Sequence, residues 1–287
     1  MKKKILLLGS KGNLATKIIN FYKNNKNVSE KFVLIKNFNK IKNKNDLKKI
    51  IDVKNLNFII NCIGYTDVEK SEKNKKIAYF ANSIIPKWLS ELLNKNKKIF
   101  VMHFSTDHVY SPKRNIKNRE DSFKAINIYS KSKLAGENFI KKINSIILRI
   151  NFFGKFKKNK KESLCYWMKK NLQKNKIIKG YSNIYFSPLH SSTISKYVFD
   201  ILENPYKGIY NLGSKNKISK YEYLKILAKG LKLNHSLIIK HSYSNYKEKV
   251  KRPKYMGMNI NKLKKKYGFT AKDIRGEIAK NIIDYQK

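Results

Sequence analysis

The chain has few cysteines and no long hydrophobic run. Cys62 and Cys165 are the only cysteines in 287 residues, and they form no Cys-x-x-Cys pair, which argues against a zinc site and a disulfide framework. No apolar run approaches the roughly 20 residues of a membrane-spanning helix. Lys2–Lys4 followed by Ile5–Leu8 resembles a signal-peptide start, but Gly9 ends the apolar stretch before the about 7–15 residues that a signal requires. We therefore expect a cytoplasmic protein without a metal site or a membrane span.

Acidic residues and arginine are also scarce. Nineteen Asp and Glu face 65 Lys and Arg, and the formal net charge of +46 would be typical of a nucleic-acid-binding protein. Only five of these basic residues are arginine, the better residue for recognising phosphates and bases. The lysines are spread over the whole chain among Asn and Ile, and all three residues share A/T-rich codons. A biased genome explains the charge, so we expect no nucleic-acid partner; a mild attraction of an anionic substrate fits either interpretation.

Short apolar runs alternate with amphipathic stretches over residues 1–150. Strand, helix and strand at this spacing predict an α/β fold with a doubly wound parallel sheet, the Rossmann-type dinucleotide-binding domain. The expected strands are Lys4–Leu8, Phe32–Ile35, Asn57–Ile63, Ile99–Ser105 and Ile146–Asn151, and the expected helices are Asn13–Asn24, Ile77–Asn94 and Tyr129–Ile143.

Residues 151–287 alternate less regularly. They predict a smaller C-terminal substrate-binding domain, some segments of which return to the dinucleotide-binding domain. Lys155–Lys161 is a lysine-rich insertion that we expect to be solvated, and Ser219 with Glu222 forms a capping-box pattern. The expected elements are helices Tyr166–Asn171, Ser219–Leu231 and Lys262–Tyr267, the last ended by Gly268, and strand Ile209–Leu212.

A glycine-rich turn follows the first expected strand. Gly9 permits a tight turn and Gly12 lets the backbone approach a pyrophosphate, while the N-terminus of the next helix holds the anion. Ala15 replaces a third glycine and still allows close packing of helix on strand. A plain strand-to-helix turn is the alternative. We expect the pyrophosphate of a dinucleotide at Gly9, Ser10, Lys11, Gly12, Asn13 and Leu14.

The end of the second expected strand carries no acidic residue. Sites that prefer NAD usually place Asp or Glu there for the ribose hydroxyls. Here the segment reads Lys36-Asn37-Phe38-Asn39, and Lys36 can meet a 2′-phosphate instead. The sequence therefore favours NADP(H), with NAD(H) possible.

The pattern Tyr-x-x-x-Lys occurs five times and is uninformative by itself in so lysine-rich a chain. Only Tyr129/Lys133 lies downstream of the strand end Ser105–Asp107 and opens a helix that leads into the next strand. Ligands of open parallel sheets bind beyond the carboxyl ends of the strands, where these segments converge. The other pairs are Tyr22/Lys26, Tyr166/Lys170, Tyr221/Lys225 and Tyr243/Lys247.

These residues predict a reductase site. Tyr129 and Lys133 share a helix face, and a nearby ammonium favours the phenolate, so we expect a lowered pKa that makes Tyr129 a usable acid. Thr106 can hydrogen-bond a carbonyl oxygen on which negative charge develops. Lys133 can also hold the ribose of a nicotinamide nucleotide.

The segments in this order resemble the extended short-chain dehydrogenase/reductases, specifically the dTDP-4-dehydrorhamnose reductase family. Ser105–Tyr110 and Tyr129–Glu137 carry the resemblance, which extends over nearly the whole chain. It implies cofactor contacts at Asp46 and Leu47 beside the adenine, at Cys62, Ile63, Gly64 and Tyr65 in a loop, and at Asn82, Tyr129 and Lys133. The implied substrate contacts are Thr106, Asp107 and Arg252.

The resemblance also implies the reaction. Related dehydratases have Thr-Asp-Glu where this chain has Thr106-Asp107-His108, so reduction is favoured over loss of water. We expect NAD(P)H-dependent reduction of a 4-keto-6-deoxy nucleotide sugar for cell-surface polysaccharide synthesis, by a possible homodimer. The family's frequent proline before the catalytic tyrosine is absent from Ala125–Ile128. The alternatives are another nucleotide-sugar epimerase or reductase, and a non-catalytic NAD(P)-binding subunit like that of methionine adenosyltransferase.

Overall fold

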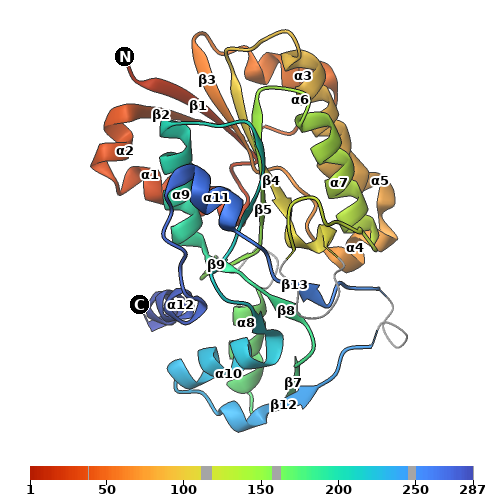
Figure 1. The fold of residues 1–287 in the computed structure, drawn as a ribbon. Coiled ribbons are helices and arrows are strands. Elements are labelled where there is room, and N and C mark those ends of the chain that lie inside the picture. The colour runs from red at the N-terminus through yellow and green to blue at the C-terminus, as the bar shows by residue number, and fades with distance from the viewer. Residues whose placement is uncertain (38, 111–117, 157–162, 245–249, 287) are drawn as a thin grey trace. The chain divides into compact units, whose positions relative to one another are not determined.

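A computed structural model describes residues 1–37, 39–110, 118–156, 163–244 and 250–286. The chain forms two compact units (Figure 1). The first unit comprises residues 1–109, 125–149 and 195–210, and the second comprises residues 110–124, 150–194 and 211–287. Four of the insertion lysines, Lys157, Lys158, Lys160 and Lys161, lie outside the described residues, as do Phe38 and Lys247.

The main sheet has six strands in the order β10-β5-β4-β3-β1-β2, and most of them lie in the first unit. β1 pairs in parallel with both β2 and β3, and β3 pairs in parallel with β4. The strand order reverses between β1 and β3, which is where doubly wound sheets bind their ligands. The predicted fold class is confirmed. The strands are β1 (Lys3–Leu8), β2 (Phe32–Lys36), β3 (Leu56–Asn61), β4 (Phe100–Thr106), β5 (Ser145–Ile150) and β10 (Gly208–Leu212).

Helices cover both faces of this sheet (Figure 1). Alternate strand residues point to opposite faces, so Leu6 and Leu8 pack with Ile85, Leu89 and Leu93 on one side. The helices on this side include α3 (Lys44–Ile51), α4 (Val68–Lys73), α5 (Lys75–Tyr79), α6 (Ile85–Leu93) and α7 (Ile128–Ile140). On the other side lie α1 (Asn13–Lys23), α2 (Lys26–Lys31) and α9 (Ser191–Glu203).

An aromatic cluster anchors the α1 and α9 side. Phe199 of α9 stacks on Phe21 of α1 at 5.9 Å between ring centroids and lies 5.8 Å from Phe32 of β2. Phe32 in turn meets Phe58 of β3 at 6.1 Å. Packing of this kind adds about 0.5–1.5 kcal/mol for each pair beyond the area buried.

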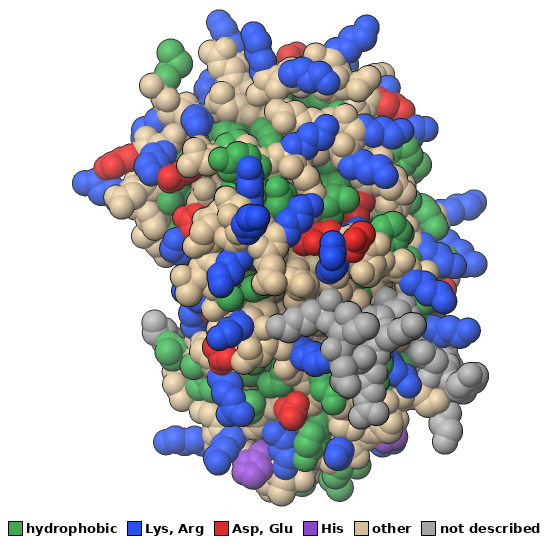
Figure 2. Space-filling view, in the orientation of Figure 1, with side chains coloured by type: hydrophobic (Ala, Val, Ile, Leu, Met, Phe, Trp, Pro, Cys, Tyr) green, Lys and Arg blue, Asp and Glu red, His purple; other side chains and the backbone are tan. Residues whose placement is uncertain are grey.

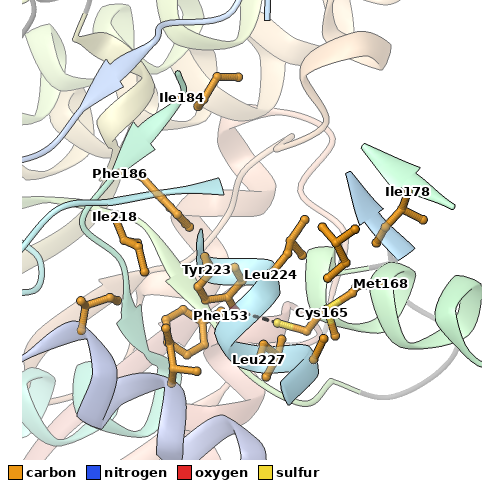
Figure 3. Packing of buried hydrophobic residues seen from close by; sticks show 14 of the residues in the cluster. Phe153, Cys165, Met168, Ile178, Ile184, Phe186, Ile218, Tyr223, Leu224 and Leu227 are labelled. Atoms are coloured by element: carbon orange, nitrogen blue, oxygen red, sulfur yellow. Dashed lines mark hydrogen bonds between the residues drawn. The ribbon is translucent and has the colours of Figure 1, made fainter. Parts of the chain in front are cut away.

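The second unit has its own apolar core (Figure 3). The Cys165 thiol is buried within this core, 2.8 Å from the Tyr223 hydroxyl. The helices are α8 (Leu164–Leu172), α10 (Lys220–Gly230), α11 (Asn261–Tyr267) and α12 (Ile274–Gln286). Short sheets join β8 (Tyr185–Phe186) to β11 (Ile218–Ser219) and β13 (Tyr255–Met256), β7 (Ile178–Tyr181) to β12 (Ile238–His241), and β6 (Phe152–Phe153) to β9 (Leu189–His190).

Two helical predictions differ from the structure. The stretch expected as one helix over Ile77–Asn94 contains a π-helical turn, Phe80–Ile84, between α5 and α6. Pro86 explains the break, because it has no N–H to donate to the carbonyl of Asn82 four residues earlier. The sequence predicted Lys262–Tyr267 as the final helix, but α12 follows it.

Lysine and arginine side chains are scattered over the face seen in Figure 2, among neutral side chains. This distribution agrees with the even spread of lysine along the sequence. Within the described ranges, no helix is long and apolar enough to cross a membrane.

Candidate active site

The turn between β1 and α1 is shaped for close approach of a ligand to the backbone. Gly9 has φ +74°, and a Cβ there would lie 2.9 Å from the nitrogen of Ile63. The Gly12 N–H donates to the Gly9 carbonyl at 2.9 Å, and Gly12 is the N-cap of α1. Because glycine cannot cap the helix with a side chain, the first N–H groups of α1 are available to an anion. The turn therefore fits a dinucleotide pyrophosphate.

Ser10 is buried in this turn and binds the backbone. Its side chain is 3% exposed and donates to the Leu7 carbonyl at 2.8 Å. Its backbone N–H points to the carbonyl of Asn37 at 3.4 Å. The glycine turn is thus tied to the end of β2, and the exposed residue Lys36 stands at that end.

Asp46 and Leu47 have structural roles at the start of α3 and in the core. The Asp46 carboxylate accepts hydrogen bonds from the backbone N–H groups of Lys42 at 2.9 Å and Asn43 at 3.3 Å. Asn43 accepts in return from the Asp46 N–H, which completes a capping box at the start of α3. Leu47 is fully buried in the core. Their contact with adenine stays a prediction.

The loop after β3 is held by Asn82. This fully buried side chain accepts from the Tyr65 N–H at 2.9 Å and donates to the Tyr65 carbonyl at 3.0 Å. It also donates to the Ser132 hydroxyl at 3.0 Å. Cys62, Ile63 and Gly64 lie in this loop, and a Cβ on Gly64 would lie 3.8 Å from Lys133 Nζ. The π-helical turn therefore places Asn82 between the predicted cofactor loop and α7.

Thr106, Tyr129 and Lys133 come together beyond the carboxyl end of β4. Asn127 and Ser130 form the capping box that starts α7, and Tyr129 lies in its first turn. All three predicted catalytic side chains are at most 8% exposed. The Thr106 hydroxyl lies close enough to the Tyr129 phenol to affect its pKa. The structure thus joins a hydroxyl, a phenol and an ammonium in one place.

Lys133 is a buried cation at this place. Its Nζ donates to the Phe104 carbonyl at 2.6 Å. Burial lowers the pKa of Lys133 to about 8, against the opposing charge effect of Glu137. The ammonium is therefore retained at neutral pH and lost in mildly alkaline solution.

The expected lowering of the Tyr129 pKa is wrong for this structure. Burial raises the pKa of Tyr129 to about 12, and the Asp107 charge adds to the rise, while the hydrogen bond with Thr106 opposes it. Desolvation outweighs the stabilisation of the phenolate that the Lys133 spacing suggested. The side chain is a protonated phenol, ready to donate rather than to accept a proton.

The predicted substrate residues differ in setting. Asp107 is 1% exposed, and its carboxylate lies 3.4 Å from the Thr106 hydroxyl. Arg252 belongs to the second unit, where its N–H donates to the Tyr243 hydroxyl at 2.8 Å. The ring of His108, a residue given no role from the sequence, meets the Tyr129 ring at 5.5 Å between centroids.

The other Tyr-x-x-x-Lys pairs have different surroundings. Tyr22 donates to the Phe32 carbonyl at the start of β2, the end opposite Lys36. Lys225 donates to the His235 carbonyl and lies over the Tyr221 ring. Tyr243 donates to the Val250 carbonyl, and Tyr166 lies on α8. Position in the fold therefore separates Tyr129 from its lookalikes.

Within the described ranges, no group of three or more His, Cys, Asp or Glu could hold a metal ion.

The sequence did not indicate Ser132, Glu137 and Arg149 as neighbours of the site residues. Glu137 could have been found from its spacing, because it follows Lys133 by four residues on α7.

The fold is doubly wound and of the dinucleotide-binding class. This class is defined by the order of the strands, by the glycine turn at the switch point and by the helices that cover both faces of the sheet. Residues 2–287 match the family model described as the RmlD substrate binding domain, so the chain belongs to this family. The family prediction is confirmed.

Similar proteins support the same fold. A probable low-salt glycan biosynthesis reductase of Haloferax volcanii is 20% identical over 229 residues, which cover 78% of this chain and 76% of the relative. A crystal structure of a dTDP-4-dehydrorhamnose reductase from Clostridium acetobutylicum has a TM-score of 0.88 at 22% identity, with 99% of this chain and 100% of that chain covered. The structure of the dTDP-4-dehydrorhamnose reductase from Bacillus anthracis in complex with NADP has a TM-score of 0.88 at 20% identity. It too covers 99% of this chain and 100% of that chain.

Proposed function

We propose that the protein is a reductase of a 4-keto-6-deoxy nucleotide sugar, similar to dTDP-4-dehydrorhamnose reductase, that uses NADPH in preference to NADH. The observation that carries this proposal is the convergence of Thr106, Tyr129 and Lys133 at the end of β4, in a chain of the RmlD family. The names of the similar proteins, which include a glycan biosynthesis reductase, support a role in polysaccharide synthesis.

The glycine turn and the end of β2 supply the cofactor contacts. The open N-terminus of α1 suits the pyrophosphate, and Lys36 suits a 2′-phosphate. Lys133 holds the ribose next to the nicotinamide. NADP is the ligand of one similar structure and NADPH of another, an enzyme of Pseudomonas aeruginosa. When bound, the reduced nicotinamide supplies a hydride.

The protein's own residues handle the carbonyl oxygen of the sugar. Tyr129 is buried and protonated, so its hydroxyl can donate a proton to this oxygen as negative charge develops. Thr106 donates a hydrogen bond to the same oxygen. Lys133, cationic below a pKa of about 8, then stabilises the phenolate that the proton transfer leaves.

The remaining roles follow the sequence predictions. The substrate sugar contacts Asp107 and Arg252. Residues 151–287 supply most of the substrate domain, and residues 1–150 supply most of the dinucleotide domain. The protein works in the cytoplasm as a homodimer. Light scattering on a sizing column would give twice the mass of the 33.8 kDa chain, whereas the mass of one chain would contradict the dimer.

One experiment tests the activity. A panel of 4-keto nucleotide sugars is incubated with NADPH or NADH, and the near-ultraviolet absorbance of the reduced nicotinamide is followed. We expect consumption with a 4-keto-6-deoxy sugar, faster with NADPH. Epimerisation without consumption would favour an epimerase, and cofactor binding without turnover of any sugar would favour a regulatory subunit.

A further inference from the structure

Beneath Lys133 lies a buried polar network that the proposed reaction does not use. Glu137 of α7 and Arg149 of β5 form an ion pair in which both side chains are at most 2% exposed. Arg149 donates through Nε at 3.0 Å and through Nη2 at 2.7 Å to the two carboxylate oxygens of Glu137. The Ser105 hydroxyl donates to the same carboxylate. Three elements, β4, β5 and α7, are therefore joined at Glu137.

The network lies directly next to the catalytic groups in sequence and in space. Glu137 follows Lys133 by one helical turn, so both side chains lie on the same face of α7. Ser105 precedes Thr106 on β4, and the Lys133 ammonium binds the carbonyl of Phe104 on the same strand. The network thus fixes both strand and helix where the ammonium is held.

Glu137 is the anion that acts on this ammonium. Two titratable groups among the described residues also interact with Lys133, and both are neutral: burial raises the pKa of the Cys62 thiol and lowers that of the His103 imidazole. Tyr129 on the same helix stays protonated, and the Asp107 charge acts on Tyr129. The carboxylate of Glu137 opposes the loss of the Lys133 proton that burial promotes.

We propose that Glu137, fixed by Arg149 and Ser105, is a positioning residue that keeps Lys133 cationic during the reaction. Stability alone does not require this arrangement, because a buried ion pair can often be replaced by apolar side chains of similar size without loss. The inference rests on the proposed function for its turnover readout, but the charge of Lys133 can also be followed through NADPH binding.

The test removes both charges together, because a single change would leave a lone buried charge. Glu137→Gln/Arg149→Met is compared with the parent in kcat/KM and in the dissociation constant of NADPH from pH 6 to 10. We expect the alkaline midpoint of both profiles to fall by about one pH unit, so that activity drops roughly tenfold above the midpoint and stays near parental at acidic pH. The single variant Glu137→Asp, which keeps both charges of the ion pair, should show the same alkaline midpoint as the parent.

Controls separate this role from a structural one. Glu277→Gln/Lys280→Met disrupts a buried carboxylate of the second unit, which Lys280 contacts at 2.6 Å, and should lower the melting temperature without moving the midpoint. Glu137→Met/Arg149→Leu is a second neutral pair to use if the first does not fold. Coincident alkaline midpoints in a folded neutral variant and the parent overturn the proposal. A shifted NADPH midpoint in a protein that reduces no sugar supports it and rejects the proposed function instead.

Discussion

At the scale of single residues, the Lys133 ammonium loses its proton in mild alkali. Its pKa of about 8 means that the ammonium is present below this pH and is lost above it. Tyr129, with a pKa raised to about 12, stays protonated throughout. We therefore predict that kcat declines as the pH rises through about 8. This alkaline decline should report the loss of the Lys133 proton and not that of the Tyr129 proton.

The same shift has an opposite effect on folding. Lys133 has an ordinary pKa of 10.5 in the unfolded chain and about 8 in the folded one, so between these values the unfolded chain binds more protons. The contribution of this group to stability therefore increases with pH over that window. Melting curves recorded as a function of pH check this effect on stability. Activity that persists to pH 10 would contradict the predicted decline of kcat.

The proposed preference for NADPH depends on Lys36. Lys36→Asp places a negative charge where a 2′-phosphate is expected, so we predict about a tenfold or larger loss of NADPH affinity and a gain for NADH. Fluorescence titrations of both nucleotides measure the ratio. Lys23→Asp, at the far end of α1, is the matched control and should leave the ratio unchanged. Equal affinities in the parent, unaltered in Lys36→Asp, would refute the assignment.

At the scale of elements, the sequence predicted the six strands of the main sheet within a few residues, because each strand is a short apolar run that is mostly buried. The break at Phe80–Ile84 could not be read in this way, since Pro86 also fits the first turn of a new helix. The sequence also predicted the wrong direction for the Tyr129 pKa. Spacing on a helix shows which groups are neighbours, but the pKa depends on burial beneath other elements.

The close approach of α7 to the π-helical turn gives an element-scale prediction. A Cβ on Gly136 would overlap the carbonyl oxygen of Asn82, whereas a Cβ on Gly276 of α12 meets no atom within 4 Å. Gly136→Ala should therefore destabilise by about 1–3 kcal/mol and reduce turnover, because α7 carries Tyr129 and Lys133. Gly276→Ala should be neutral or stabilising by up to about 1 kcal/mol. Denaturant unfolding measures both; equal stabilities would show that α7 tolerates the displacement.

At the scale of the whole molecule, we expect the net charge of +46 to speed the capture of an anionic substrate without forming a specific site. Replacing Lys157, Lys158, Lys160 and Lys161 with Gln should leave kcat nearly unchanged. The loss in kcat/KM should be confined to low salt, because salt screens such attraction. Steady-state rates at two ionic strengths test this. A tenfold rise in KM that persists at high salt would mean that the segment binds the nucleotide sugar.

The central claim is that Tyr129 is the proton donor in the reduction of a 4-keto-6-deoxy nucleotide sugar. The most direct measurement compares turnover with NADPH for the parent and Tyr129→Phe, with Tyr22→Phe, Tyr166→Phe, Tyr221→Phe and Tyr243→Phe as controls. Loss of one hydroxyl should preserve the fold and lower kcat by roughly 10²–10⁴, while the controls keep most activity. Parental turnover by a folded Tyr129→Phe would contradict the account.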